Sequence, residues 1–245
     1  DLAEVQALYQ ATQVIHFAKK PGLEEIVAKR VEFLTGYQNA AYADSYKALV
    51  DQVHSAEQAL GKGTRLSEAV ARYLFKLMAY KDEYEVARLH TDAAFTTKLA
   101  NMFEGDYKLV HHLAPPLLAQ KDDQGHLRKK TFGPWVRSAF GVLTRLRGLR
   151  GTAFDVFGYT EERRTERALI ATYRQDITAL LAGLTQERLA LAVEIASVPE
   201  GIRGYGHVKE RHLEAAQAKR AALLAQWSAP VAAAADVAQR GTVAH

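Results

Sequence analysis

Helical periodicity covers most of the chain. Apolar residues recur at three- and four-residue steps over residues 23–60 and again over 66–87. Such spacing places apolar side chains on one face of an α-helix. The second stretch is the clearest amphipathic helix in the sequence, with the stripe Leu66, Val70, Tyr73, Leu77, Tyr80, Tyr84 and Ala87. We expect the tyrosines of both stretches to lie in the core or at the edge of an interface.

Further helices are predicted from their start and stop signals. Proline and glycine end the helical pattern of residues 1–22, and Pro134 stands at the first position of a helix that closes at glycine. Thr160 is a typical N-cap for the helix that follows it, and Thr185 begins another that ends near Pro199. A last helix is expected over about 207–227.

Strand signals occur only in the middle of the chain. Residues 107–118 are short and apolar, and a turn-like segment separates them from a second possible strand that ends near residue 132. The fold class is therefore mainly α: an irregular multi-helix domain with at most one small β-hairpin. We expect residues 1–228 to form a single helical domain and the alanine-rich residues 229–245 to form a frayed tail.

Composition excludes several kinds of chemistry. The 245-residue chain has 48% hydrophobic residues, enough for a sizeable core, and it contains no cysteine. Disulfides, cysteine-ligated zinc, iron–sulfur clusters and thiol nucleophiles are therefore excluded from it. There is no run of 18 apolar residues and no secretory leader, so we expect a cytoplasmic protein without a membrane partner.

Positive charge is concentrated in one segment. The net charge is only +4, but residues 124–154 contain no acid. This segment matches no nucleic-acid-binding module, so nucleic acid is not an expected partner. A solvated or interface-facing basic surface is the preferred interpretation of its cations: Arg128, Lys129, Lys130, Arg137, Arg145, Arg147 and Arg150.

Histidine spacing does not support a metal site. His207 and His212 are five residues apart, which on a helix separates them by about 140° around the axis, too far for one ion. His111 and His112 are adjacent and would point to opposite faces of a strand. The sequence also lacks the serine-nucleophile and phosphate-loop motifs. We therefore assign no metal ligand and no catalytic residue.

The turn before the last predicted helix is the best candidate site. Two glycines precede a helix start, where free amides and the helix dipole favour an anion. The candidate anion or interface residues are Arg203, Gly204, Gly206, His207 and Lys209. The favoured interpretation of the same residues is a plain helix entrance, in which Gly206 is the N-cap and Glu210 or nearby acids satisfy the charge, and anion binding is the hypothesis set beside it.

A second group of charged residues lies on the predicted 66–87 helix and just beyond it. Lys81 with Glu85, and Glu85 with Arg88, have the spacing of ion pairs on a solvated helix face, and Asp82 and Glu83 are placed on the same polar faces. A catalytic role for these residues is the less favoured interpretation. The interface candidates are Lys76, Lys81 and Arg88.

Five long blocks carry a resemblance to a known family. They are "RVEFLTGYQNAAYADSY" (30–46), "LMAYKDEYEVARL" (77–89), "FEGDYKLVHHLAPPLL" (103–118), "LRGTAFDVFGYTEERRTERALI" (149–170) and "IRGYGHVKERHL" (202–213). In this order they resemble the C-terminal region of long, fused bacterial indolepyruvate ferredoxin oxidoreductases. The resemblance spans roughly residues 20–225. The absence of an initial methionine agrees with a piece of a longer protein.

The resemblance implies a function for the parent enzyme. Such enzymes oxidatively decarboxylate arylpyruvates to acyl-coenzyme A with reduction of ferredoxin, using thiamine diphosphate and iron–sulfur clusters. The chain has no cysteine, and its Gly105-Asp106 pair does not begin a thiamine diphosphate motif. No cofactor is therefore assigned to this chain. Thiamine diphosphate, the iron–sulfur cluster and coenzyme A belong to the parent, and the isolated chain is expected to be inactive.

Three roles remain open for the chain itself. The preferred role is a structural domain that packs against upstream domains of the same polypeptide or against a dimer partner, and the first alternative is a domain that contacts a ligand such as the coenzyme A diphosphate. The third possibility is a free-standing helical binding protein. Clustering of the shared blocks on a concave pocket favours a ligand, and clustering on a flat face favours assembly.

Overall fold

The computed structural model describes most of the chain between residues 21 and 229. The described ranges are 21–61, 63–93, 97, 101–102, 110–113, 130–133, 135–204 and 206–229, without the side chains of 111–113, 130, 206 and 207. The predicted helix over 1–22 and the predicted tail therefore fall almost entirely outside the described residues. Within these ranges the fold is mainly α, as predicted.

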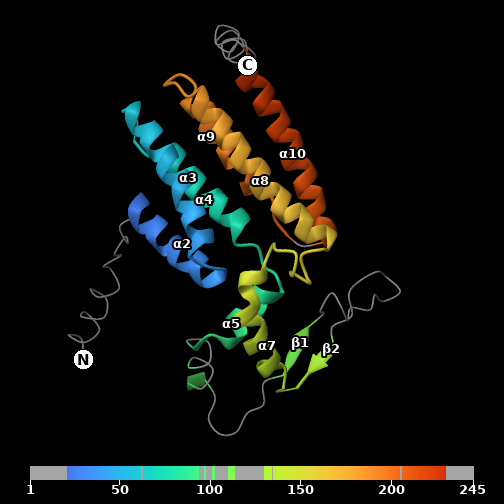
Figure 1. Cartoon of the computed structure of the whole chain (residues 1–245). Coiled ribbons are helices and arrows are strands. Elements are labelled where there is room, and N and C mark those ends of the chain that lie inside the picture. Colours follow the sequence, from blue (N-terminus) through green and yellow to red (C-terminus); the bar gives the residue numbers. More distant parts are fainter. Residues whose placement is uncertain are drawn as a thin grey trace, which may run out of the picture.

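Helices form a bundle with a smaller layer beneath it (Figure 1). The bundle contains α2 (Leu23–Tyr37), α3 (Ala40–Ala59), α4 (Arg65–Met78), α8 (Glu161–Ala182), α9 (Leu189–Ser197) and α10 (Gly206–Ser228). The layer beneath contains α5 (Glu83–Thr91), α7 (Val136–Arg145), β1 (His111–Leu113) and β2 (Lys130–Phe132). Two 3₁₀ turns, η1 (Leu146–Leu149) and η2 (Val198–Gly201), follow α7 and α9.

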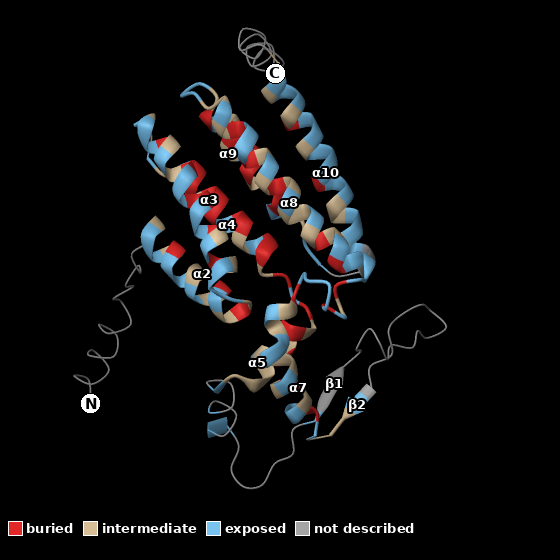
Figure 2. Cartoon of the chain, in the orientation of Figure 1, coloured by how far each residue is buried: buried red, intermediate tan, exposed pale blue. Residues whose placement is uncertain are grey.

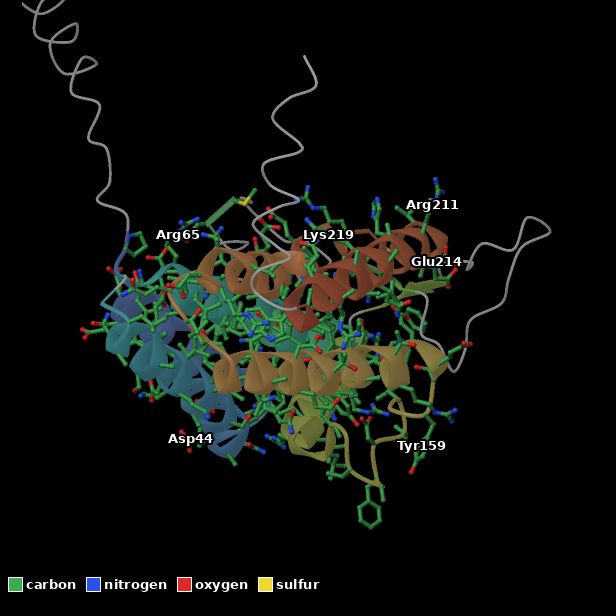
Figure 3. The ribbon with its side chains drawn as sticks, turned by 90° about the horizontal axis from the view of Figure 1, so that it is seen from above. Asp44, Arg65, Tyr159, Arg211, Glu214 and Lys219 are labelled. Atoms are coloured by element: carbon green, nitrogen blue, oxygen red, sulfur yellow. The ribbon has the colours of Figure 1, made fainter. Side chains whose placement is uncertain are left out.

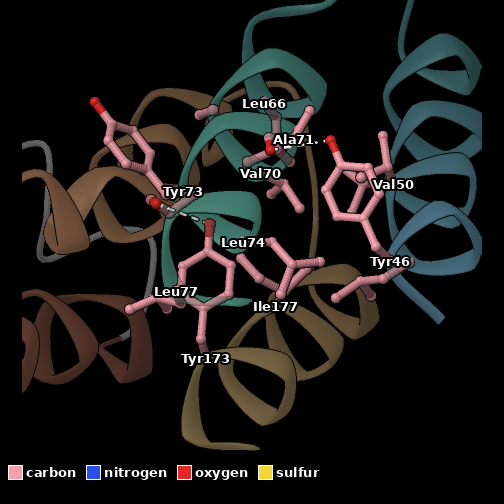
Figure 4. Packing of buried hydrophobic residues seen from close by; sticks show 14 of the residues in the cluster. Tyr46, Val50, Leu66, Val70, Ala71, Tyr73, Leu74, Leu77, Tyr173 and Ile177 are labelled. Carbon is pink, nitrogen blue, oxygen red and sulfur yellow. Dashed lines mark hydrogen bonds between the residues drawn. The ribbon is translucent and has the colours of Figure 1, made fainter. Parts of the chain in front are cut away.

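The main core lies where the bundle helices face one another, and buried residues gather on those faces (Figure 2). Tyr37, Tyr46, Tyr73 and Tyr173 are buried in this core, and Tyr42 packs against it partly buried. Tyr46 donates its hydroxyl to the carbonyl of Ala71 at 3.1 Å, and Tyr173 donates to Ala196 at 2.9 Å (Figure 4). Each buried ring therefore keeps its polar atom satisfied by a neighbouring helix.

The first long apolar pattern forms two helices and not one. Residues 23–60 break after Tyr37, and α3 restarts at Ala40. Asn39 caps the new helix, because its side-chain oxygen accepts a hydrogen bond from the Tyr42 amide at 2.9 Å. The break lets α2 and α3 pack side by side, so the apolar faces of these two helices contact each other.

The 66–87 pattern is also broken, after Met78. Asp82 caps α5 by accepting from the Glu85 amide at 2.9 Å, and α5 leaves the bundle to pack against α7. The prediction of one solvated helical face is therefore wrong for Asp82 and Glu85, which are both buried. The predicted pairing of Glu85 with Arg88 is confirmed by two hydrogen bonds of 2.8 Å.

A buried glutamate holds the turn between α3 and α4. Glu57 accepts hydrogen bonds from the amides of Leu66 and Ser67, both at 2.8 Å, and from the Ser67 hydroxyl at 2.5 Å. It thus caps α4 from a different helix. His54 lies 3.4 Å from the same hydroxyl, but the carboxylate binds the serine and not the histidine. The cluster therefore lacks the order of a catalytic triad.

The remaining elements follow the sequence closely. β1 and β2 pair antiparallel with His111 opposite Phe132, which confirms the small hairpin. Thr160 caps α8 as predicted, through the Arg163 amide at 3.3 Å. Helix α9 begins at Leu189, four residues later than predicted, and α10 spans Gly206–Ser228.

Candidate functional site

A cavity of about 390 Å³ opens where the end of α4, the first turns of α8 and the turn before α10 meet. Leu77, Leu169 and Ile202 form part of its apolar lining. Six charged residues line the same cavity: Lys76, Lys81, Glu162, Glu166, Arg203 and Lys209. Two groups that the sequence presents as separate candidates, one near residue 80 and one at 203–209, are thus brought to one place.

Lys76 ties α4 to the turn η2. Its Nζ donates to the carbonyl of Pro199 at 2.7 Å and to that of Glu200 at 3.1 Å. A lysine ammonium has three donors, so one remains for a ligand. Burial, helped by the charge of Arg203, lowers the pKa of Lys76. A bound anion would offset both effects.

Arg203 and Lys81 are the most available cations of the cavity. The Arg203 guanidinium is exposed, donates from Nε to the Glu200 carbonyl at 3.1 Å, and lies 3.7 Å from the Glu200 carboxylate. That pairing is loose and solvent-screened. Lys81 is exposed in the turn after α4, and within the described residues it has no hydrogen bond or ion pair.

Gly204 gives the turn its shape. Its φ is +86°, a conformation that L side chains rarely adopt, and a Cβ added there would lie 2.8 Å from the Val208 side chain. A glycine at this position allows the chain to bend from Arg203 into α10 close to the cavity wall. Of the other predicted residues here, Gly206 begins α10, and the His207 side chain is outside the described atoms.

Lys209 is committed to the protein itself. Its Nζ donates to Glu166 Oε1 at 2.6 Å and lies 3.9 Å from Glu162. The acid that satisfies this lysine therefore belongs to α8 and is not the neighbouring Glu210. The other oxygen of Glu166 accepts from Arg163 at 2.5 Å. Glu166 thus links α10 to α8, and Lys209 acts mainly as a positioning residue for the cavity wall.

The series of ion pairs formed by Lys209, Glu166 and Arg163 continues toward α5. The Arg163 Nε lies 3.7 Å from Glu83. Burial by itself would lower the pKa of Arg163, but Glu166 and Glu83 outweigh it and the pKa is raised. The pKa of Glu83 is also raised, mainly by burial, because Arg163 only partly compensates for the lost hydration.

A second network of buried hydrogen bonds is centred on Arg150. Arg150 is 4% exposed and donates to both oxygens of Asp82, at 2.6 and 2.8 Å. The prediction that it belongs to a basic surface is therefore wrong. Its guanidinium also donates to the Tyr37 carbonyl at 2.5 Å and stacks over the Tyr37 ring. Tyr80, on the cavity wall, has its pKa raised to about 12, chiefly by burial.

Sequence analysis missed Glu162 and Glu166 of the site, as well as the Asp82–Arg150 pair. An i,i+4 pair of glutamates on the α8 helix was the available signal for the first two. Arg88, an interface candidate, is not at the cavity: it binds Glu85 and lies over the Phe33 ring, 5.0 Å from its centroid.

The arrangement is suited to binding a small anion. Four cations face two carboxylates, which leaves the lining with a net charge of +2. The described lining residues include no serine, threonine, cysteine or histidine. In the part of the chain that the structure describes, no group of three or more histidine, aspartate or glutamate side chains is placed to hold a metal ion. No described helix is long and apolar enough to cross a bilayer.

The cavity is lined almost wholly by the sequence blocks that carry the family resemblance. Every lining residue except Lys76 belongs to the blocks 77–89, 149–170 or 202–213. These blocks are distant in sequence and meet at one end of the bundle (Figure 1). They converge on a concave surface and not on a flat one.

Comparison with known proteins identifies a family but no described relative. No curated protein and no solved structure matches the chain. The model of a family of unknown function, DUF6537, matches residues 23–222, which include every described helix except the last residues of α10. Because this match covers most of the chain, the protein belongs to the DUF6537 family.

Proposed function

We propose that the chain is a non-catalytic helical domain that binds an anionic group, and that it forms the C-terminal part of an indolepyruvate-type 2-oxoacid:ferredoxin oxidoreductase in the cytoplasm. The parent would oxidatively decarboxylate arylpyruvates to acyl-coenzyme A and pass electrons to ferredoxin. Resemblance of the five sequence blocks supports the parent assignment. Thiamine diphosphate and iron–sulfur chemistry would reside upstream of this domain.

The observation that carries the ligand-binding role is the charge balance inside the cavity. Lys209 is neutralised by Glu166, whereas Lys76, Lys81 and Arg203 have no carboxylate within hydrogen-bond distance. Three such cations beside an apolar wall favour a ligand that has a phosphate or carboxylate and an apolar or aromatic body. In the parent, the coenzyme A diphosphate or a carboxylate from a neighbouring domain meets this description.

Titration calorimetry with pyrophosphate tests the site on the chain as it stands. The variant Lys81→Ala/Arg203→Ala should bind pyrophosphate at least about tenfold more weakly, because each lost charge-assisted hydrogen bond is worth about 1.5–3 kcal/mol. The matched control, Lys29→Ala/Arg211→Ala, removes two exposed cations from elsewhere and should bind like the wild type. Equal affinities for the two double variants would refute the site.

The parent assignment has its own experiment. In the full-length enzyme, Lys81→Ala/Arg203→Ala should raise the KM for coenzyme A and leave kcat unchanged, since these residues bind without touching the reacting atoms. The isolated chain should not turn over indolepyruvate with a low-potential acceptor. Turnover by this chain alone would refute the non-catalytic role.

An interface-forming role is the second candidate, and one feature supports it. The charged residues Arg150, Arg163 and Glu166 are committed to internal bonds that fix the helix ends. Such a rigid frame also suits a docking platform. If Lys81→Ala/Arg203→Ala loosened assembly of the full-length enzyme and left the KM for coenzyme A unchanged, the assembly role would replace the ligand role. A reading frame no longer than this chain would instead indicate a free-standing binding protein.

A further inference from the structure

A histidine of the last helix holds the turn that carries Arg203. His212 lies on α10, and its Nδ1 is 2.8 Å from the carbonyl oxygen of Arg203. A carbonyl oxygen only accepts hydrogen bonds, so Nδ1 carries a proton and donates it to this bond. The distance is that of a well-formed hydrogen bond. His212, whose spacing from His207 is wrong for a metal ion, therefore has a definite partner in the fold.

The position of the Arg203 main chain depends on this bond. The Ile202 amide donates to the Pro199 carbonyl at 3.2 Å, but no main-chain hydrogen bond joins the backbone of Arg203 to another described residue. Gly204 follows with a φ of +86°, and glycine has the widest choice of backbone conformations. The imidazole of His212 is thus the group that fixes the chain between η2 and α10.

The turn also sets the distance between two of the cations. Arg203 Nε and Lys76 Nζ both donate to the carbonyl oxygen of Glu200, each at 3.1 Å. Two nitrogens that share one acceptor can lie no farther apart than twice that distance. Like charges so close together repel, and one anion bound by both would remove the repulsion. A shift of the Arg203 backbone would carry its guanidinium away from the shared acceptor and from Lys76.

His212 itself is not in a position to contact the anion. It is absent from the lining of the anion cavity, which includes Lys76 and Arg203. It lines a separate cavity of about 420 Å³, together with Glu200 and Gly201 of η2. Any effect of the histidine on anion binding must therefore pass through the turn.

We propose that His212 is a positioning residue of the anion cavity: its Nδ1–H holds the Arg203 carbonyl, so that the Arg203 guanidinium stays beside Lys76 and both cations bind the same phosphate or carboxylate. The proposal rests on the anion-binding role proposed above and adds a residue that the ligand does not touch. A guanidinium that is held in place beforehand loses less conformational entropy when the anion binds.

Pyrophosphate titrations of single variants of the full chain test this role. His212→Ala removes the donor and should weaken binding about fivefold or more, because the ligand must then order the Arg203 side chain. His212→Asn should restore most of the affinity, since its amide nitrogen reaches the position of Nδ1. His212→Gln, whose amide reaches the position of Nε2, should not. The matched control is Glu214→Ala, which removes an exposed side chain from α10 (Figure 3) and should bind like the wild type.

A double variant shows whether His212 acts through Arg203. If it does, His212→Ala/Arg203→Ala should bind no more weakly than Arg203→Ala, because the guanidinium that the histidine positions is already absent. Additive losses would overturn the proposal. So would equal affinities of His212→Ala and the wild type, or a His212→Asn variant that binds no better than His212→Ala. A wild type that binds no pyrophosphate would refute the anion cavity itself, and this proposal with it.

A measurement on the unaltered protein is independent of ligand binding and of the folding of any variant. Nitrogen-15 NMR of histidine side chains distinguishes a neutral ring protonated at Nδ1 from one protonated at Nε2. In alkaline buffer, where the ring is neutral, His212 should carry its proton at Nδ1, because the carbonyl partner fixes the tautomer. The signal is assigned by its absence from the spectrum of His212→Gln. A ring protonated at Nε2 would have no proton to donate to Arg203 and would overturn the proposal.

Discussion

Arg150 donates two parallel hydrogen bonds to Asp82, a residue 68 positions earlier in the chain. Asp82 is at the same time the N-cap of α5, and Arg150 also binds the Tyr37 carbonyl at the end of α2. One guanidinium therefore fixes the end of one helix and the start of another.

Replacing Arg150 by alanine should be strongly destabilising. Removing one partner of a buried ion pair leaves the other charge unpaired, which costs about 3–5 kcal/mol. Urea unfolding measures the loss. The matched control is Lys47→Ala, which removes the exposed pair with Asp51 and should cost about 0.3–0.5 kcal/mol. Arg150→Lys should not restore stability, because lysine lacks the two-pronged geometry. Full stability of that variant would mean that charge alone is sufficient.

Leu77 and Lys81 should differ sharply in their response to truncation. Leu77 is buried in the main core, so Leu77→Ala should cost about 2–5 kcal/mol. Lys81 is exposed in the turn after α4, so Lys81→Ala should change stability by no more than about 0.5 kcal/mol. Urea midpoints of the two variants decide the matter. Similar losses would show that the side of α4 that faces the core has been misassigned.

Gly158 should not tolerate a side chain. A Cβ at this position would lie 2.5 Å from Asp155 Oδ2, and hydrogen bonds prevent that carboxylate from moving. Gly158→Ala should cost about 1–3 kcal/mol through overpacking. Gly148→Ala is the control, since a Cβ there meets nothing within 4 Å. Thermal melts of both variants test the prediction, and equal melting temperatures would argue against a rigid loop.

As the pH rises, anion affinity should begin to fall at a lower pH than the titration of an ordinary lysine would produce. Burial and Arg203 lower the pKa of Lys76, so its ammonium loses its proton at a lower pH than an ordinary lysine does. Sulfate stays doubly charged over this range, and its affinity should decline as the pH rises through the lowered pKa. Lys76→Arg should remove the early decline, because a guanidinium stays charged, and Lys81→Arg should keep it. Calorimetry at several pH values tests this. If Lys76 took no part in binding, Lys76→Arg would leave the pH dependence of the sulfate affinity unchanged.

Glu83 should make stability fall as the pH rises through mildly acidic values. Its pKa in the folded protein is raised, so between the unfolded and folded pKa values the folded state holds more protons. The free energy of unfolding then decreases with rising pH across that window. Glu83→Gln should therefore gain stability over the wild type at neutral pH and lose the advantage below about pH 4. The exposed Glu25→Gln serves as control, and a gain that grows in acid would contradict the assignment.

Local signals were sufficient for most elements. Thr160 caps α8, the hairpin strands pair, and most tyrosines of the apolar stripes are buried, as the sequence predicts. These features depend on residues only a few positions apart, such as a cap and the amide three residues on. Their outcome therefore needs little information from the rest of the fold.

The periodicity of apolar residues does not predict the helix breaks after Tyr37 and Met78. The apolar stripe continues from Leu77 through Tyr84, and nothing in that stretch forbids a helix. What ends α4 is the position of Asp82, held by an arginine from a distant segment. A contact over 68 residues outweighs the local preference, because leaving the buried guanidinium unpaired would cost more than one interrupted helical turn.

The sequence by itself determined which residue types can bind an anion, because charge and glycine flexibility belong to individual residues: Lys76, Lys81 and the turn 203–209 are visible without a structure. Only the tertiary structure decided that they share one cavity and that Lys209 is neutralised by Glu166 while Arg203 remains available. The physical reason is that an ion pair forms between groups that the fold brings within a few ångströms, and helix packing, not sequence spacing, sets those distances.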